Sequence, residues 1–185
     1  MKKILKRIMA LSLCACMMMG AASTASAASY NTLGSNQVSF DTQLGHYFHV
    51  YGNNNRYLNM YTSGTPTNGT KVTTWSRIEN DPTQAWDIGY LADGSFIIVV
   101  NNNRNLAIDF NRNFNTPDVQ LYSWVGDYYD DVVMGQGLGP NEPIKLVNRN
   151  SYLNVTNTNT AVYDANGKVC VWNSTPTTWV HHLDW

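Results

Sequence analysis

Short runs of alternating apolar and polar residues fill positions 46–185, and no stretch among them sustains the 3.6-residue apolar period of a helix. Turn-forming pairs interrupt these runs at strand-length intervals, among them Asn68-Gly69, Asp93-Gly94 and Asn166-Gly167. The pattern predicts an all-β fold built from short strands and tight turns.

The apolar runs repeat three times along the chain. Strand-like segments begin at Phe48, Phe96 and Ile144, and each is followed by an Asn-rich turn, a second short strand, a loop and a third strand that ends in Trp or Tyr. Corresponding positions recur about every 48 residues, which indicates an internal repeat. One unit is too small to bury its apolar face alone, so we expect three pseudo-symmetric four-strand repeats to close one barrel-like core. The predicted repeats span about residues 46–93, 94–141 and 142–185, as a single domain after a lead-in segment at 28–45.

The first 27 residues have the pattern of a secretory signal peptide. A basic start at positions 2–7 precedes an apolar run of about 13 residues, and Ala25-Ser26-Ala27 forms a small-residue cleavage site. The run is short of the roughly 20 residues that span a bilayer. We therefore expect cleavage after Ala27, secretion and no membrane insertion. The alternative is a lipoprotein signal through Leu13-Cys14-Ala15-Cys16, which would leave an even shorter apolar run.

Charge and cysteine content narrow the class of partner. Cleavage would remove four of the 12 basic residues and none of the 13 acidic ones, which leaves a net charge of about −5. A mildly acidic chain without basic runs is poorly suited to nucleic acid or to an anionic membrane surface. Cys170 would be the single remaining cysteine, so stability has to come from the core rather than from a disulfide. Its thiol is a half-buried apolar group, a reactive group or a link to a second chain.

Alternation within the second and third strands assigns side chains to two faces. Leu58 and Met60 share the apolar phase in the first unit, so Asn59 between them is predicted to face outward. The same phase places an aromatic residue on the outward face of each unit, at Trp75, Tyr122 and Trp172.

An exposed aromatic ring beside a few polar groups is what a sugar site requires. The C–H patch of a hexose lies flat on such a ring, while its hydroxyls need fixed donors and acceptors. If the second and third strands of each unit pair as a hairpin, amide and carboxylate groups lie near each ring. The predicted carbohydrate-binding residues are Asn59 and Trp75 in the first unit, Asp109, Gln120 and Tyr122 in the second, and Asn154 and Trp172 in the third. The alternative is that the loops at 62–70, 110–117 and 157–167 cap these rings, which then only stabilise each unit.

The twelve expected strands, the aromatic residue at the end of each third strand and one Gln-x-Trp motif at Gln84-Ala85-Trp86 resemble the ricin-type β-trefoil lectin domain family. The resemblance covers about residues 46–185. In the other two units Asp131-Val132-Val133 and His181-His182-Leu183 stand in place of the motif. The resemblance implies a β-trefoil fold and a lectin function in which the three aromatic residues are sugar platforms. It also adds Gln84 to the predicted carbohydrate-binding residues.

The chain departs from the galactose-binding pattern of this family. That pattern carries an Asp on the outer face of the second strand, where alignment of the repeats places Asn59, Ala107 and Asn154. An amide keeps hydrogen-bonding capacity but loses the strength of a charge-assisted bond. No unit has the complete galactose set, so the resemblance implies glycan binding without implying galactose.

Other classes of function are disfavoured. The sequence has no Gly-x-Ser-x-Gly elbow, Cys–His pairing, metal motif or phosphate loop, so we expect no catalysis, no cofactor and no metal. The adjacent His181 and His182 face opposite ways on a strand and cannot chelate one ion together. The expected partners are extracellular or cell-surface glycans, bound at one or more of the three units. The alternative is a trefoil that binds a separate protein partner through its loops, as a protease inhibitor or as the docking subunit of a toxin complex.

Overall fold

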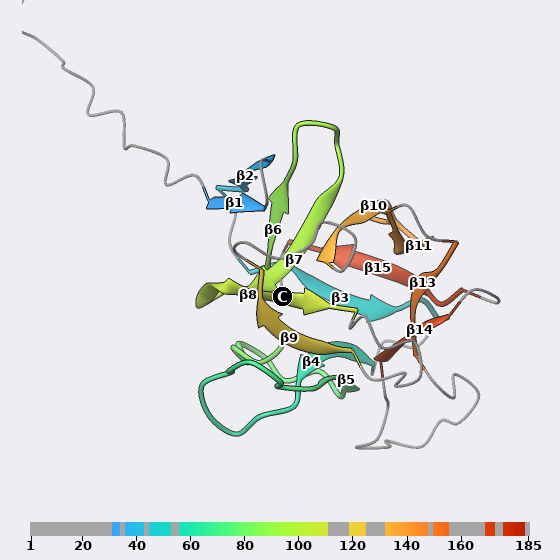
Figure 1. Cartoon of the computed structure of the whole chain (residues 1–185). Helices are drawn as coiled ribbons and strands as arrows, with labels where there is room; N and C mark the ends of the chain where they lie inside the picture. The colour runs from blue at the N-terminus through green and yellow to red at the C-terminus, as the bar shows by residue number, and fades with distance from the viewer. Residues whose placement is uncertain are drawn as a thin grey trace, which may run out of the picture.

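Every regular element whose bounds lie in the described part of the chain is a β-strand, which confirms the predicted all-β class (Figure 1). The computed structural model describes residues 31–33, 36–42, 45–52, 56–110, 119–124, 132–147, 150–155, 169–172 and 176–183. The predicted signal peptide at 1–27 lies outside these ranges. Within them, no helix has the length and apolar character needed to cross a membrane.

The strands form two sheets. In chain order they are β1 (Asn31–Leu33), β2 (Asn36–Phe40), β3 (Tyr47–Val50), β4 (Tyr57–Met60), β5 (Val72–Trp75), β6 (Trp86–Tyr90), β7 (Phe96–Val100), β8 (Asn103–Asp109), β9 (Gln120–Ser123), β10 (Met134–Gln136), β11 (Glu142–Pro143), β12 (Lys145–Leu146), β13 (Tyr152–Val155), β14 (Val169–Trp172) and β15 (Thr178–His182). The larger sheet has the order β1-β2-β6-β7-β10-β12-β13-β14, with β8 paired to β7 and β9 to β8, and the smaller has the order β11-β15-β3-β4-β5. Pairing among the described residues closes neither sheet into a barrel. Barrel closure and the full threefold repeat therefore stay predictions.

Three hairpins, β4–β5, β8–β9 and β13–β14, share one pattern of pairing. Residues at the same place in each hairpin pair as Leu58 with Thr74, Ile108 with Leu121 and Leu153 with Val171. The hairpins also touch one another, because Val72 N donates to Val119 O and Val119 N donates to Val169 O. The predicted pairing of second and third strands is thus present in all three units.

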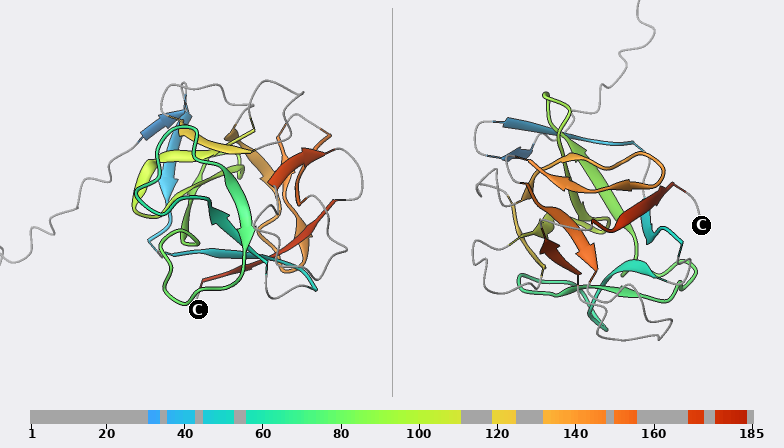
Figure 2. Two further views of the ribbon diagram at one scale, coloured as in Figure 1. Left: turned by 90° about the horizontal axis from the view of Figure 1, so that it is seen from below. Right: turned by 90° about the vertical axis from the view of Figure 1, so that its right-hand side faces the viewer.

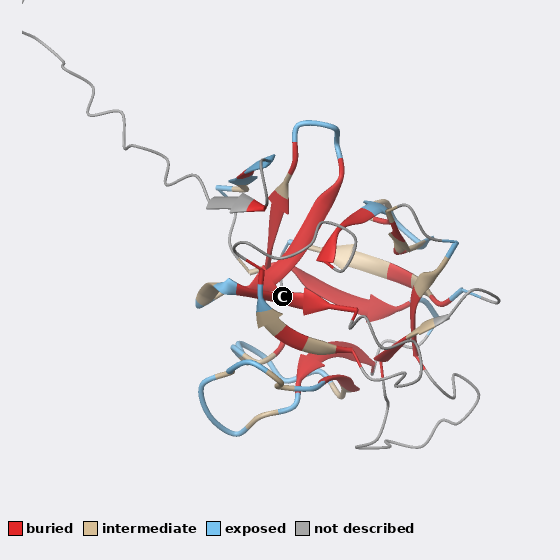
Figure 3. Cartoon of the chain, viewed as in Figure 1, coloured by how far each residue is buried: buried red, intermediate tan, exposed pale blue. Residues whose placement is uncertain are grey.

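One hydrophobic core gathers the inward side chains of these hairpins, and the strands are buried over most of their length (Figure 3). The buried residues of this core that the alternation placed inward are Leu58, Met60, Val72, Leu106, Ile108, Val119, Leu121, Leu153, Val155 and Val169. Thr74 is buried as well. The inward phase predicted from the sequence is therefore confirmed.

Two buried tryptophans hold the fourth strands of the first and third units against the core. The indole N–H of Trp86 donates to Leu58 O at 3.2 Å, and that of Trp179 donates to Leu153 O at 2.9 Å. Since Leu58 and Leu153 occupy the same place in their hairpins, Trp179 is the counterpart of Trp86. The predicted placement of the third motif at 181–183 is therefore wrong.

The register of β15 on β3 explains this correction. Strand β15 runs antiparallel beside β3 (Figure 2). In this pairing Trp179 lies opposite Val50, whereas His181 lies opposite Phe48. In the second unit Asp131 lies outside the described residues, and β10 begins with Met134, which is buried in the same core.

The predicted lead-in segment forms a hairpin that belongs to the fold. Strands β1 and β2 pair with each other, and β2 pairs with β6 beside the β6–β7 hairpin (Figure 1). Leu33 and Val38 from this hairpin join a second apolar cluster with Ile97, Val99 and Ala107. The outward side chains of β7 and Ala107 of β8 are therefore buried in a cluster to which a segment that precedes the repeats contributes.

Close packing of β2 on β6 depends on the absence of a side chain at Gly89. A Cβ at this position would lie 2.5 Å from Val38 Cγ1 and 3.0 Å from Phe40 Cε1. We expect Gly89→Ala to lower the free energy of unfolding by about 2 kcal/mol, the usual scale for overpacking, as measured by urea unfolding. Gly64→Ala is the matched control, because nothing lies within 4 Å of a Cβ there. Equal stability of the two variants would contradict the close approach.

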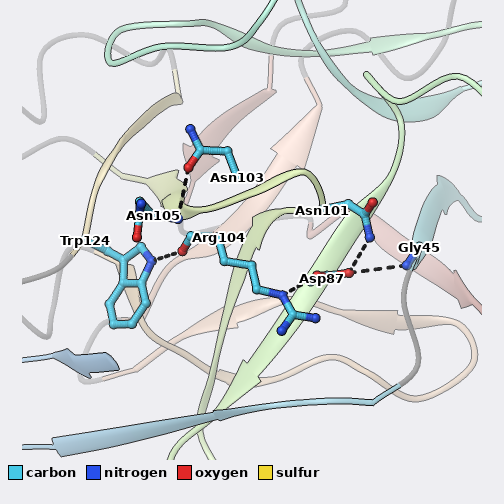
Figure 4. A network of polar contacts seen from close by, with 7 residues as sticks. All are labelled: Gly45, Asp87, Asn101, Asn103, Arg104, Asn105 and Trp124. Carbon is cyan, nitrogen blue, oxygen red and sulfur yellow. Dashed lines mark hydrogen bonds and ion pairs between the residues drawn. The ribbon is translucent and has the colours of Figure 1, made fainter. Parts of the chain in front are cut away.

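A buried carboxylate joins the lead-in, β6 and the turn before β8 (Figure 4). Asp87 accepts hydrogen bonds from Arg104 Nε at 2.6 Å, Asn101 Nδ2 at 2.7 Å and Gly45 N at 3.3 Å. The Arg104 guanidinium lies 4.7 Å from the centre of the Phe40 ring in a cation–π contact. Because its charge is paired and its oxygens are bonded, Asp87 can be buried, and it links Gly45, just before β3, to Asn101 and Arg104 after β7.

Candidate functional site

A surface pocket of about 530 Å³ lies on the outward face of the β4–β5 hairpin. Its described lining residues are Asn59, Tyr61, Thr62, Ser63, Trp75, Ile78, Asp81 and Thr83. The loop between β4 and β5, which supplies part of this lining, is exposed over much of its length (Figure 3). Two residues predicted from the sequence, Asn59 and Trp75, thus meet at one cavity.

Trp75 ends β5 and presents a half-buried ring to the pocket. Trp75 lines the pocket, and no described residue accepts a hydrogen bond from its indole N–H. Tyr61 is 56% exposed and Ile78 is 46% exposed, and both line the same pocket. The wall is therefore apolar and aromatic, as stacking on a sugar requires.

The amide of Asn59 is buried and held by its neighbours. Its Nδ2 donates to Met60 O at 2.9 Å, and its Oδ1 accepts from Thr83 Oγ1 at 3.1 Å. Oδ1 has a second lone pair that this bond does not use. Asn59 therefore contributes an oriented acceptor at the floor of the pocket.

Gln84 lies beneath the pocket rather than in it. It is fully buried, its Nε2 donates to Ser76 O at 2.7 Å, and its Oε1 accepts from Ile78 N at 3.1 Å. Both ends of the amide thus bind the backbone of the loop that follows Trp75. The expected contact of Gln84 with a ligand is corrected: this side chain positions the loop that carries Ile78.

The same loop brings a carboxylate that sequence reasoning missed. Asp81 Oδ1 accepts from Thr83 N at 2.8 Å and lies 2.8 Å from Thr83 Oγ1. This is an Asx turn, and Asp81-Pro82-Thr83 is a sequence that favours one. The sequence therefore indicates a turn at Asp81, but no local pattern indicates that this turn folds back against Asn59.

The second unit brings its three predicted residues together. Asp109 lies directly opposite Gln120, and Gln120 Oε1 accepts from the Tyr122 hydroxyl at 3.1 Å. Asp109 is only 7% exposed, whereas Gln120 and Tyr122 are partly exposed. The loop of the first unit packs along this strand, because Gly69 N donates to Leu121 O. The neighbouring residues 111–118 lie outside the described part of the chain.

The placement of Ala107 at the position of Asn59 is wrong. In the first unit Asn59 pairs with Thr73, which lies two residues before Trp75. In the second unit the residue two before Tyr122 is Gln120, and its partner is Asp109. A register shift between Val99 and Val100 in the β7–β8 ladder inserts extra residues into β8. Counting from the preceding strand therefore misaligns the second unit, which does carry an Asp at this place.

The third unit is described only in part. Asn154 is buried, with Oδ1 accepting from Thr177 N at 2.5 Å and Nδ2 donating to Tyr152 O at 3.3 Å. Its amide therefore binds the backbone. Trp172 ends β14 opposite Tyr152, but its side chain lies outside the described residues. Cys170, opposite Asn154, is buried, which favours the apolar interpretation of its thiol.

Two stacked histidine pairs lie where β15 meets β3. His46 Nδ1 is 2.7 Å from His181 Nε2, and His182 Nε2 is 2.7 Å from His49 Nδ1. His181 and His182 thus face opposite sides of β15, as predicted. Among the described residues no three His, Cys, Asp or Glu side chains are grouped to hold a metal ion.

Burial alters the titration of these rings. Burial, and then the nearby His46, lowers the pKa of His181 from 6.5 to about 4. Burial, and then His182, lowers the pKa of His49. In each pair one nitrogen has to accept the proton of the other, so the pair forms only while at least one ring is neutral.

Comparison with known proteins defines the fold. No family model matches the chain, and no curated protein matches significantly. Among solved structures, a mosquitocidal holotoxin matches with a TM-score of 0.60 and 15% identity over 78% of this chain, which spans only 18% of the holotoxin chain. The designed threefold symmetric protein ThreeFoil matches with a TM-score of 0.56 and 23% identity over 74% of this chain and 97% of its own.

These two likenesses show the fold alone, and that fold is the β-trefoil. A third structure, the β-trefoil lectin of the Vibrio vulnificus hemolysin/cytolysin with N-acetyl-D-lactosamine bound, has 14% identity over 77% of this chain and 96% of its own. Its TM-score of 0.47 is too low to support a conclusion.

Proposed function

We propose that the protein is a carbohydrate-binding β-trefoil protein whose main site is the pocket beside Trp75. The observation that carries this proposal is the half-buried Trp75 ring in one cavity with the Asn59 amide. The ring offers a flat surface to the C–H face of a sugar, and the amide oxygen accepts from a hydroxyl. The resemblance of the repeats to ricin-type lectin domains supports the same assignment.

The second unit offers a further sugar contact. Asp109, Gln120 and Tyr122 join a carboxylate, an amide and an aromatic ring on one hairpin. A single shallow sugar site binds weakly, but two sites on one rigid body gain through effective concentration on a dense glycan surface. The basic and apolar pattern at 1–27 supports secretion, so the glycans in question would be extracellular or on cell surfaces.

Removal of the Trp75 ring tests the main site. In a glycan array with the processed protein, residues 28–185, we expect Trp75→Ala to weaken binding at least about tenfold, or about 1.4 kcal/mol. The loss follows because stacking on the ring supplies much of the contact area of a shallow site. Tyr51→Ala is the matched control, since Tyr51 is 57% exposed but does not line the pocket.

The binding data distinguish a sugar site at Trp75 from a site in another unit and from a protein partner. Unchanged binding by a folded Trp75→Ala variant would place the sugar site in another unit. Absence of binding to any glycan by the folded parent protein would contradict the proposed function and would favour a protein partner, to be sought by pull-down.

A further inference from the structure

Asp81 is the only charged residue among the described residues that line the pocket. We propose that it is the specificity-determining residue of this site and that it selects neutral glycans over glycans with a carboxylate or sulfate on the bound sugar. This inference rests on the proposed carbohydrate-binding function of the pocket and adds the class of ligand that the pocket takes.

The backbone of Asp81 is held on both sides. Asp81 N donates to Ile78 O at 3.3 Å, across a turn in which Asn80 has a left-handed φ of 58°. Gln84 N donates to Asp81 O at 3.0 Å. The Gln84 side chain also binds the backbone of this loop at Ser76 and Ile78. Hydrogen bonds therefore fix the turn that carries Asp81.

The orientation of the carboxylate is set by its neighbour Thr83. Oδ1 is occupied by the backbone N–H of Thr83 and lies near the Thr83 hydroxyl, both at 2.8 Å. No described residue donates to Oδ2. The second oxygen is thus left to accept a hydrogen bond from a ligand hydroxyl, and the Asx turn aligns it without ordering a flexible side chain at the moment of binding.

The polar groups of the pocket are clustered beside the ring. The Thr83 hydroxyl lies within hydrogen-bond distance of both Asn59 Oδ1 and Asp81 Oδ1. Of these acceptors the carboxylate makes the stronger bond, because hydrogen bonds to an ionised acceptor are about twice as strong as neutral ones. Asp81 therefore provides a charged acceptor, whereas Asn59 on the second strand provides only a neutral one.

The same charge discriminates between ligands. The other described lining residues are aromatic, hydroxyl, amide or aliphatic, so no cationic side chain among them compensates an anionic sugar. Arg77 and Glu79 are exposed on the same loop but do not line the pocket. Repulsion between charges is screened over about 8 Å at physiological ionic strength. The discrimination should therefore apply to an anion on the sugar that occupies the pocket and fade for anions farther along a glycan.

Matched neutral and anionic sugars test the proposal. The probes are galactose with galacturonic acid, glucose with glucuronic acid, and lactose with 3′-sialyllactose, titrated against the processed protein by tryptophan fluorescence and ligand-observed NMR. We expect a neutral member to bind at least about tenfold more tightly than its anionic counterpart. Asp81→Asn should weaken binding of the neutral sugar about tenfold, as expected for loss of a charged acceptor, and bring the neutral-to-anionic ratio close to one.

Two variants control for the fold and for overall charge. Asn keeps the Oδ1 acceptor and hence the turn, and Asp81→Ser, whose hydroxyl also caps such a turn, is the second variant if the first unfolds. Glu79→Gln removes the same charge from the same loop without altering the lining, so its binding and its neutral-to-anionic ratio should match the parent protein.

Each outcome has a definite meaning. Parent-like affinity and ratio in Asp81→Asn, with binding lost in Trp75→Ala, would overturn this inference and leave the proposed function standing. Tighter binding of anionic than of neutral sugars by the parent protein would also overturn it. Absence of binding to every probe and to the glycan array would overturn the proposed function and this inference together.

Discussion

Replacing Trp179 by alanine is expected to lower the free energy of unfolding by about 4 kcal/mol. The ring is fully buried in the main core, and its indole N–H donates to Leu153 O. Alanine would leave a cavity of nearly the whole indole and a buried carbonyl without its donor, and both effects destabilise the folded state. Urea unfolding followed by circular dichroism measures the change.

Leu183 provides the control for this prediction. If residues 181–183 were the true counterpart of the Gln-x-Trp motif, Leu183 would occupy the buried position and Trp179 would not. In the structure Leu183 is 41% exposed, so Leu183→Ala should change the unfolding free energy by no more than about 0.5 kcal/mol. Trp179→Phe, which keeps an aromatic ring but loses the N–H, should lower the unfolding free energy by an amount between those of Trp179→Ala and Leu183→Ala. A small loss in Trp179→Ala would contradict the register of β15 on β3.

Mild acid is expected to destabilise the junction between β15 and β3. His181 has a pKa of about 4 in the folded protein against 6.5 when unperturbed, so the unfolded chain binds its proton first as the pH falls. Stability is therefore fully present above about pH 6.5 and is lost progressively toward pH 4. Because the ring is partly exposed and solvent screens its charge, we expect a loss of about 2 kcal/mol over this range.

Protonation of the histidine pairs is expected to weaken the contact between β15 and β3. The charges of His46 and His182 disfavour protonation of His181, whereas a backbone hydrogen bond of Leu138 and the charge of Asp41 favour it. Once both rings of a pair are charged, each nitrogen at the 2.7 Å contact carries a proton, and the contact becomes repulsive. The C-terminal strand should then loosen from β3, seen as faster amide exchange in β15 at pH 4.5 than at pH 7.

A double variant separates this effect from general acid unfolding. His181→Gln with His49→Gln removes the two rings whose pKa values are lowered, so the fall in stability between pH 6.5 and pH 4.5 should largely disappear. The stability loss at lower pH, where carboxylates in general become protonated, should remain. An unchanged pH dependence in the double variant would exclude the histidine pairs as its cause.

The candidate site was only partly predictable. Asn59 and Trp75 were placed on one outward face by strand alternation, and the observed hairpin brings them to one pocket. Asp81 was missed, because its contact with the site depends on how the loop at 76–85 folds back, and local sequence shows only that a turn forms there. Asp109 was assigned to the wrong repeat position, because a bulge in the preceding ladder leaves no clear mark in the apolar pattern.

Local pattern alone determined the all-β class, the inward phase of the three hairpins and the aromatic residues at the ends of the third strands. These properties follow from the two-residue alternation of a strand, which each short segment carries by itself. Tertiary structure decided which side chains are buried. Ala107 lies in a second apolar cluster to which β1 and β2 contribute, Gln84 binds the backbone of a loop, and the register of β15 brings Trp179 into the core. Burial of an outward face depends on segments distant in the chain, and alternation within one strand contains no information about them.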